Sequence, residues 1–261
     1  MIDFHAHIFP EKIADKTIPH LAEVCGTGPF TNGKEEGLLQ SMEKAGVTCS
    51  VILPVVTAPK QFDSINRFAM QYLSGDKLLS FGGIHPDNDN YKERLRWIKE
   101  QGFKGIKFHP DYQETYFNDI KYKRMISYAS ELDLIVVTHA GYDPVSPKII
   151  HCTPQMVEEV LDEVAPTKLV LAHLGGNEMF DEVEQRLVGR DVYFDTANLL
   201  NRIEDEQLIR IIRNHGVEKI LFATDSPWGD QKEFVEYFQN LSLSEIEKNK
   251  IFMENAVKLL R

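Results

Sequence analysis

The strongest constraint on the fold is a recurring pattern of about eight short runs rich in Val, Ile and Phe, each followed by a stretch with apolar residues three and four apart. The runs cover residues 2–7, 48–54, 78–84, 103–109, 134–139, 168–173, 192–197 and 219–224. Because nearly every position in them is apolar, they are typical of parallel strands covered on both faces. A chain of 261 residues is long enough for one eightfold barrel, which needs roughly 250. No G-x-G-x-x-G follows the first run, so we predict an α/β fold with a single (β/α)8 TIM barrel over residues 1–261.

Helices are expected between the runs, for example at residues 34–45, 90–101 and 154–164. Two connections exceed the usual few residues: the segment after His7 that runs through Phe30 to Asn32, and the segment 141–153. Both follow strand carboxyl ends, the face on which barrel enzymes build their active sites. We therefore expect either segment to line or cover the pocket, or to be decoration without function.

The charge and hydropathy of the chain exclude several classes of partner. A net charge of −11 without a Lys/Arg cluster argues against nucleic acid, and no apolar stretch reaches the roughly 18 residues that span a bilayer. The first residues show no secretory signal, which predicts a cytoplasmic protein. Cys25, Cys49 and Cys152 are odd in number and widely spaced, so they are expected to be structural thiols. A small-molecule substrate is expected, and a homodimer is left open.

Histidine recurs at the ends of the predicted strands. His5 and His7 are two apart on the first run, so both imidazoles point the same way. His139 and His173 end two other apolar runs, and Asp225 directly follows the last run. Each feature alone is ordinary, since a lone strand-end histidine is usually a core residue and an aspartate there is usually a helix cap. Barrel closure brings the last strand beside the first, so together they predict a metal site.

These residues resemble the amidohydrolase superfamily. The resemblance rests on His5-x-His7, on the strand-end His139 and His173, and on the segment Thr-Asp-Ser-Pro-Trp at 224–228. The segments Ala-His-Leu-Gly-Gly at 172–176 and Asn-Ala-Val-Lys-Leu-Leu at 255–260 are similar to those of the amidohydrolase-2 branch, which contains hydrolases and non-oxidative decarboxylases. The motifs extend from the first strand to the final helix, and they are specific for the superfamily rather than for a substrate.

The resemblance implies that His5, His7, His139 and Asp225 are ligands of one divalent ion and that His173 stands beside a metal-activated water. Nitrogen and carboxylate ligands with an open position suit Zn2+, and Mn2+, Fe2+ and Co2+ stay open. Such an ion lowers the pKa of water toward about 7. Asp225 is expected to take up the proton and return it to the leaving group, with His173 as the assisting base or electrophile.

Lys107 and His109 form a second pair on one strand face. The Lys-x-His motif is similar to the one in urease, which implies that Lys107 is carbamylated and bridges two ions while His109 contacts a substrate carbonyl. The alternative keeps Lys107 as an ammonium that binds a substrate carboxylate, and a third interpretation makes it a surface or ion-paired residue. Two ions would draw His139 and His173 onto the second one.

Other polar residues are weaker candidates. Asp3 is expected to share the face of His5 and His7, and to orient a ligand imidazole or pair with Lys107, with a simple buried polar contact as the alternative. Trp228 is a candidate pocket wall for substrate binding, with core packing as the alternative. His85 and Asp195 are further candidates for contacts behind the ligands, whereas the histidines expected to be ordinary loop or surface residues are His20, His151 and His215.

The leading functional prediction is a metal-dependent hydrolase that uses an activated water on an amide, ester or lactone bond of a small substrate. The alternative is a metal-dependent decarboxylase of an unsaturated or aromatic carboxylic acid. A barrel that merely binds a metabolite is the third interpretation, and the filled ligand positions argue against it.

Overall fold

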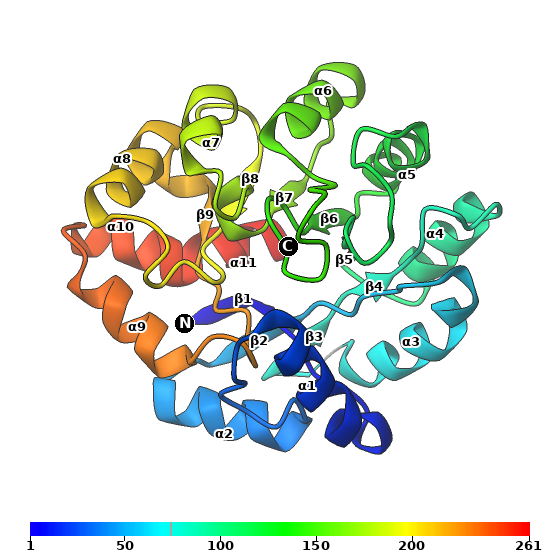
Figure 1. The fold of residues 1–261 in the computed structure, drawn as a ribbon, viewed down its shortest axis with the longest axis horizontal. Coiled ribbons are helices and arrows are strands. Elements are labelled where there is room, and N and C mark those ends of the chain that lie inside the picture. The colour runs from blue at the N-terminus through cyan, green and yellow to red at the C-terminus, as the bar shows by residue number, and fades with distance from the viewer. Residues whose placement is uncertain (74) are drawn as a thin grey trace.

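The strands form a closed parallel barrel. The computed structural model describes residues 1–73 and 75–261, and all the strand pairs in this part are parallel. The strands follow one another in chain order around the barrel: β1 (Ile2–Ala6), β2 (Cys49–Ile52), β3 (Leu78–Ser80), β4 (Gly82–Gly83), β5 (Gly105–Phe108), β6 (Ile135–Thr138), β7 (Leu169–Leu171), β8 (Tyr193–Asp195) and β9 (Ile220–Leu221). Figure 1 shows the helices as a ring around them, so the predicted TIM barrel is confirmed.

The barrel closes between the first and last strands. The Phe4 amide donates to the Phe222 carbonyl at 2.8 Å, and the His7 amide donates to the Ser226 carbonyl at 2.6 Å. A parallel bridge between Ala6 and Ser226 continues this seam toward the carboxyl end of β1. Asp225 therefore lies beside His5, as closure predicted, and its amide donates to the His5 carbonyl at 2.9 Å.

The third predicted run is split into two strands. Residues 78–84 were expected to form one strand, but β3 and β4 are separated at Phe81 and belong to different hydrogen-bonded sheets. The Phe81 amide still donates to the Ile52 carbonyl at 2.9 Å, so the ring of strands stays continuous at the break. Phe81 is fully buried and packs edge-on against Phe4, which fills the space that the break opens.

The outer layer consists of helices that follow the strands. Their bounds are α1 (Glu11–Cys25), α2 (Glu35–Ala45), α3 (Phe62–Ala69), α4 (Tyr91–Glu100), α5 (Ile120–Glu131), α6 (Pro154–Val164), α7 (Phe180–Arg186), α8 (Asp205–His215), α9 (Gln231–Asn240), α10 (Glu245–Asn249) and α11 (Asn255–Leu260). One π-helical turn, Lys250–Glu254, joins α10 to α11, and short 3-10 turns lie at Pro59–Gln61, Met70–Tyr72, His173–Gly175 and Val217–Lys219. The helices predicted at 34–45, 90–101 and 154–164 correspond to α2, α4 and α6.

Helix α1 occupies the long segment after His7 and was not predicted. Only Ala14 and Ile18 on it are buried, and Pro19 lies inside it, so its sequence shows a weak apolar stripe and a helix breaker. The second long segment, 141–153, contains no helix or strand. Gly141 anchors its start in a bridge to Asn177 with a φ of +86°, and an added Cβ would meet the Asn177 backbone nitrogen at 2.1 Å. A side chain there would displace this loop from the barrel mouth.

Two apolar layers hold the barrel together. The larger joins the outward residues of the strands to the helices, and the smaller fills the interior with residues such as Phe4, Val137 and Val170. Ala256 and Leu259 of α11 belong to the interior cluster, and Figure 1 shows α11 running toward the middle of the ring. The polar side chains at the carboxyl ends of the strands therefore stand on a rigid, dry base.

No helix in the described ranges 1–73 and 75–261 has the length and apolar character that crossing a membrane requires.

Candidate functional site

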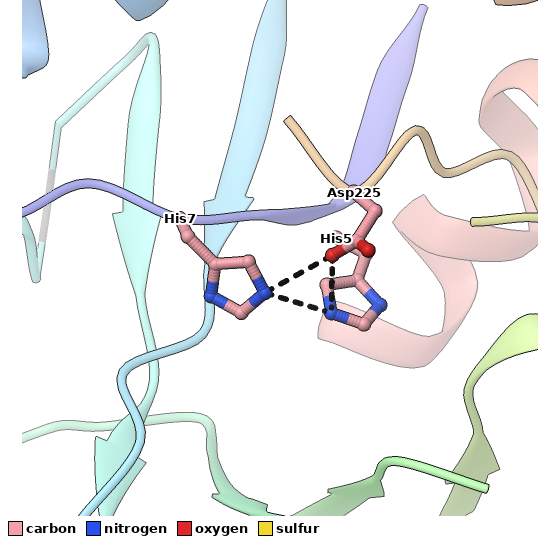
Figure 2. Close-up of side chains that lie close together, drawn as sticks. All are labelled: His5, His7 and Asp225. Carbon is pink, nitrogen blue, oxygen red and sulfur yellow. Dashed lines mark hydrogen bonds and ion pairs between the residues drawn. The ribbon is translucent and has the colours of Figure 1, made fainter. Parts of the chain in front are cut away.

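His5, His7 and Asp225 converge at the carboxyl end of the barrel, where β1 meets the loop after β9 (Figure 2). The two imidazole Nε2 atoms are 3.1 Å apart. The Asp225 Oδ1 atom lies 3.1 Å from His7 Nε2 and 3.4 Å from His5 Nε2. His5 and Asp225 are buried, and His7 is half-buried. Burial alone would raise the pKa of Asp225, but the contacts with His7 hold it below the ordinary value, so the carboxylate is ionised.

In both imidazoles the outer nitrogen, the Nδ1 atom that points away from the site, is bonded to a hydrogen-bond acceptor. His7 Nδ1 donates to the Leu53 carbonyl and His5 Nδ1 donates to the Asp195 carboxylate, each at 2.8 Å. Burial holds the pKa of His5 well below its ordinary value, and the charge of Lys107 adds to this effect. A neutral imidazole with a proton on Nδ1 has a bare Nε2 lone pair. Lone pairs turned toward each other and toward a carboxylate repel one another unless a positive charge lies near them, which the Lys107 ammonium, 3.2 Å from His5 Nε2, or a bound cation can supply.

The distances fit a divalent metal ion. Ligand atoms about 2.0–2.2 Å from one ion lie roughly 3.0–3.6 Å from one another. The three separations among His5 Nε2, His7 Nε2 and Asp225 Oδ1 fall between 3.1 and 3.4 Å. The carboxylate–histidine contact between Asp195 and His5 is the arrangement that usually orients a metal-binding imidazole. These three residues, called the metal-binding group below, thus have the geometry that could hold a metal ion.

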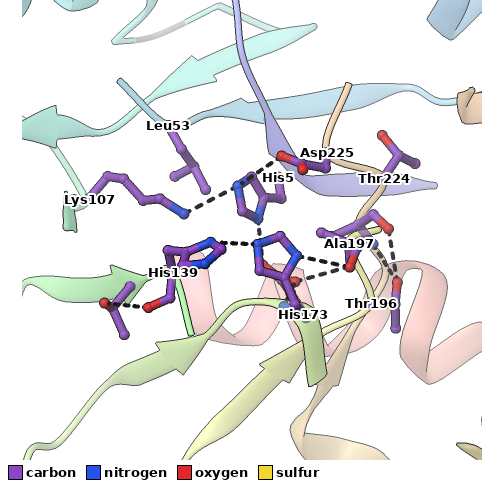
Figure 3. Close-up of polar contacts among 12 residues, drawn as sticks. His5, Leu53, Lys107, His139, His173, Thr196, Ala197, Thr224 and Asp225 are labelled. Atoms are coloured by element: carbon purple, nitrogen blue, oxygen red, sulfur yellow. Dashed lines mark hydrogen bonds and ion pairs between the residues drawn. The ribbon is translucent and has the colours of Figure 1, made fainter. Parts of the chain in front are cut away.

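His139 and His173 form a second facing pair next to the first (Figure 3). His139 Nδ1 lies 3.0 Å from His173 Nε2, and the His5 and His173 ring centroids are 5.4 Å apart. His173 Nδ1 donates to the Ala197 carbonyl at 3.0 Å, so its Nε2 is bare in the neutral ring. The structure thus brings three of the four predicted ligands into one group and places His139 beside it, with its Nδ1 toward His173.

The backbone is strained at His173 and Asp225, the two predicted catalytic residues. Both have a positive φ, 56° at His173 and 66° at Asp225, which residues with a Cβ adopt only at a cost of about 1–3 kcal/mol. Asp195 Oδ1 accepts from the His173 amide at 2.9 Å, while its Oδ2 holds the His5 ring. One buried carboxylate therefore fixes a residue from each facing pair.

Lys107 points into the same space from β5. It is in register with Val137, which belongs to the interior cluster, so both side chains face the inside of the barrel. Its Nζ lies 3.2 Å from His5 Nε2 (Figure 3), and the side chain is 1% exposed. Burial lowers the pKa of Lys107 from 10.5 to about 8, although Asp195 and Asp225 oppose the change. No carboxylate among the described residues lies within ion-pairing distance of Nζ, so no ion pair within this part of the chain neutralises the ammonium.

His109 directly follows β5, on which Lys107 lies, and contacts the long loop 141–153. Its ring stacks on His139 with centroids 4.3 Å apart and planes 10° apart. Its Nδ1 accepts from the Tyr112 amide at 3.4 Å, and its Nε2 lies 3.4 Å from Asp143 Oδ2. The ligand-capable atoms of His109, His139 and Asp143 lie within 4.8 Å of one another, as do those of His5, His7 and Asp225.

Asp3 does not take the position that the sequence suggested. It contacts neither a ligand imidazole nor Lys107, so its role is the alternative one, a buried polar contact. Its carboxylate accepts from the backbone of His5, from the backbone and hydroxyl of Thr224, and from the Gln231 amide. The register of β1 shifts after Asp3, so the strict alternation behind the expectation fails. Asp3 thus stabilises the seam of the barrel, and Asp195 is the residue that holds the His5 ring.

Several other residues differ from expectation. His151 and His215 were expected to be ordinary loop or surface residues, but both are buried. His215 stacks on Phe194 and bonds to the Val192 carbonyl, which is a core role, whereas His151 Nδ1 bonds to Asp111 Oδ1 at 2.9 Å.

The structure places the remaining candidates as follows. His20 is exposed on α1. His85 is buried but contacts Asp87 rather than the metal-binding group. Trp228 is half-buried, and its amide donates to the Asp225 carbonyl at 2.8 Å, which ties the loop after β9 into a turn.

The sequence matches the amidohydrolase-2 family, described as Amidohydrolase, over residues 2–261, so the chain belongs to this family. No curated protein matched the sequence.

Solved structures share the fold at low sequence identity. A 5-carboxyvanillate decarboxylase from Sphingomonas paucimobilis is 15% identical with a TM-score of 0.74, and the match covers 100% of this chain and 98% of the other. A dihydroxybenzoic acid decarboxylase from Polaromonas with bound manganese is 16% identical with a TM-score of 0.69 over 99% and 96%. A probable 2-pyrone-4,6-dicarboxylic acid hydrolase from Acinetobacter baumannii is 15% identical with a TM-score of 0.67 over 99% and 98%. At these identities the likeness shows the TIM-barrel fold.

Proposed function

We propose that residues 1–261 act as one domain, a metal-dependent hydrolase that cleaves an amide, ester or lactone bond in a small carboxylic acid. The observation that carries the proposal is the convergence of the His5 and His7 Nε2 atoms with Asp225 Oδ1, all within 3.4 Å. The family to which the chain belongs is consistent with this chemistry.

The proposed cation ligands are His5, His7 and Asp225, with His139 at the edge of the group. A divalent cation held there polarises a carbonyl and lowers the pKa of water toward about 7. We propose Zn2+ because imidazole and carboxylate donors with an open position suit it. The manganese in the related decarboxylase keeps Mn2+ open, and the second facing pair of His139 and His173 leaves room for a second ion.

The proposed proton carriers are His173 and Asp225. Burial lowers the pKa of His173, so its ring is neutral at pH 7, and its bare Nε2 can accept a proton from the attacking water. Asp225 is ionised and lies beside the same space, so its carboxylate can take up a proton and return it to the leaving group. The Asp195 contact with the His173 amide keeps the acceptor nitrogen aimed at this space during both transfers.

Lys107 is the proposed anchor for a substrate carboxylate. At pH 7 most molecules carry the ammonium, because the pKa near 8 lies above that pH. A charge-assisted hydrogen bond from a buried ammonium to a carboxylate contributes about 1.5–3 kcal/mol. His109 and Trp228 are proposed to contact the rest of the substrate.

We expect Lys107→Met to raise KM for a carboxylate substrate roughly 10–100-fold, the equivalent of one such bond, with little change in bound zinc. The methyl ester of the same substrate provides the matched control, because it offers no anion and should be turned over equally by both proteins. Loss of zinc together with equal losses on acid and ester would instead indicate that Lys107 is a carbamylated bridge between ions.

A decarboxylase of an unsaturated or aromatic acid is the second candidate. It is favoured by the related solved structures that are described as decarboxylases and by the ammonium of Lys107 close to the cation ligands. The two functions separate when zinc-loaded protein is given small carboxylated lactones, amides, esters and aromatic acids in heavy-oxygen water. Heavy oxygen in the product without carbon dioxide supports the hydrolase. Release of carbon dioxide without label in the product would overturn it in favour of the decarboxylase.

A further inference from the structure

Three imidazoles of the candidate site share a feature: the ring nitrogen that points away from the site is held in place. His5 Nδ1 bonds to Asp195 at 2.8 Å, His7 Nδ1 to the Leu53 carbonyl at 2.8 Å, and His173 Nδ1 to the Ala197 carbonyl at 3.0 Å. Each of these contacts sets which ring nitrogen carries the proton, and so leaves the other one bare toward the site.

His139 is the exception among the four, and its ring is reversed. Its Nδ1 faces His173, so its outer nitrogen is Nε2. That Nε2 is buried and has no hydrogen-bond partner among residues 1–73 and 75–261. Asp111 Oδ2 is also buried and without a partner in the same part of the chain, and it lies 3.8 Å from His139 Nε2. If the two atoms moved slightly closer, a proton on His139 Nε2 would form a hydrogen bond to Asp111 Oδ2 and give both atoms a partner.

Asp111 is the better of two acceptors near His139. Asp143 Oδ2 is also 3.8 Å from Nε2, but it lies 3.4 Å from His109 Nε2, and Asp143 Oδ1 accepts from the Val145 amide at 2.8 Å. The Asp111 side chain is fully buried, whereas 12% of the Asp143 side chain is exposed. The open acceptor is therefore on Asp111.

His151 holds Asp111 from the far side. Its Nδ1 lies 2.9 Å from Asp111 Oδ1, and its amide donates to the same oxygen at 3.2 Å. Both donors act on Oδ1, so Oδ2 is left to face His139. The long loop 141–153, which supplies His151, thus connects to the metal-binding group through one buried carboxylate.

We propose that Asp111, held by His151, is a positioning residue that accepts the Nε2 proton of His139 and thereby keeps the His139 Nδ1 bare toward His173, beside the metal-binding group. The proposal rests on the cation site of the proposed function and is independent of the reaction that the enzyme catalyses. The opposite tautomer would leave a bare Nε2 facing two carboxylates, which is unfavourable in a buried place.

The test compares Asp111→Asn with Asp143→Asn, because both carboxylates lie equally far from His139. In Asp111→Asn, the two His151 donors should keep their hydrogen bonds to the side-chain oxygen of the asparagine. The NH2 group of the asparagine then faces His139 Nε2 and favours the tautomer with the proton on Nδ1. We expect the affinity for zinc, measured by calorimetry on metal-free protein, to fall about 10–100-fold in Asp111→Asn and to fall by less in Asp143→Asn, whose carboxylate belongs to the second cluster with His109 and His139. The melting temperatures of the metal-free proteins report whether both variants fold.

NMR of isotope-labelled histidine supplies a readout that a general structural role would not change. Zinc-loaded wild type should show a proton on His139 Nε2, and that signal should be lost in Asp111→Asn while the His173 Nδ1 proton remains. A bare His139 Nε2 in wild type, or equal losses of affinity in the two variants, would overturn the proposal. Absence of zinc binding in wild type would overturn the cation site itself, whereas zinc binding that Asp111→Asn leaves unchanged would overturn only the role of Asp111.

Discussion

Asp225→Asn is expected to lower kcat/KM by about 10³-fold or more, because the carboxamide can neither carry the proton nor supply a full negative charge to the cation. The side chain keeps nearly the same shape in the variant. The backbone N–H of residue 225 still donates to the His5 carbonyl, so the barrel seam should stay closed. The measurement is kcat/KM and zinc content on one preparation, and both are expected to fall.

The matched control is Asp191→Asn. The Asp191 side chain is 84% exposed and pairs with Lys219 on the surface, so its neutralisation should leave turnover and zinc content unchanged. An Asp225→Asn enzyme that retains its zinc and turns over within tenfold of wild type would contradict the role assigned to this carboxylate.

His173→Asn is expected to reduce kcat by about 10²–10⁴-fold while zinc remains bound at His5, His7 and Asp225. The reason is that His173 Nε2 is the proposed proton acceptor and lies beside the metal-binding group rather than in it. Steady-state kinetics and elemental analysis of the same sample separate loss of proton transfer from loss of the ion. His20→Asn, an exposed change on α1, should be silent in both. An unchanged kcat in His173→Asn would refute the assigned role, and loss of zinc would make His173 a ligand.

The barrel and the convergence of its strand ends could be predicted because they depend on local pattern and chain order. Apolar runs at regular spacing specify buried parallel strands, and a parallel barrel must bring all carboxyl ends to one face. Closure alone then places Asp225 beside His5, whose carbonyl accepts from the Asp225 amide. The family resemblance, confirmed by the match over residues 2–261, was carried by these strand-end residues.

The contacts behind the ligands could be predicted only in part: Asp195 was a candidate for them, but its partner His5 was not identified. The shift of register in β1 sends Asp3 to the seam, and a short-range sequence pattern contains no information on such a shift. The contact of Asp195 with His5 spans 190 residues, and that of Asp111 with His151 spans 40 residues through an irregular loop. Helix α1 was missed because most of its side chains face solvent.

Two further expectations from the sequence stay predictions. The cytoplasmic location rests on the cysteine spacing, and the homodimer rests on the general frequency of symmetric pairs.

The central claim is that separated side chains gather around a common cation, and a crystal of the zinc-loaded protein measured at the zinc absorption edge tests it most directly. The account predicts an anomalous peak bounded by His5 Nε2, His7 Nε2 and the Asp225 carboxylate. A well-ordered barrel with those imidazoles turned apart and no peak among them would contradict it.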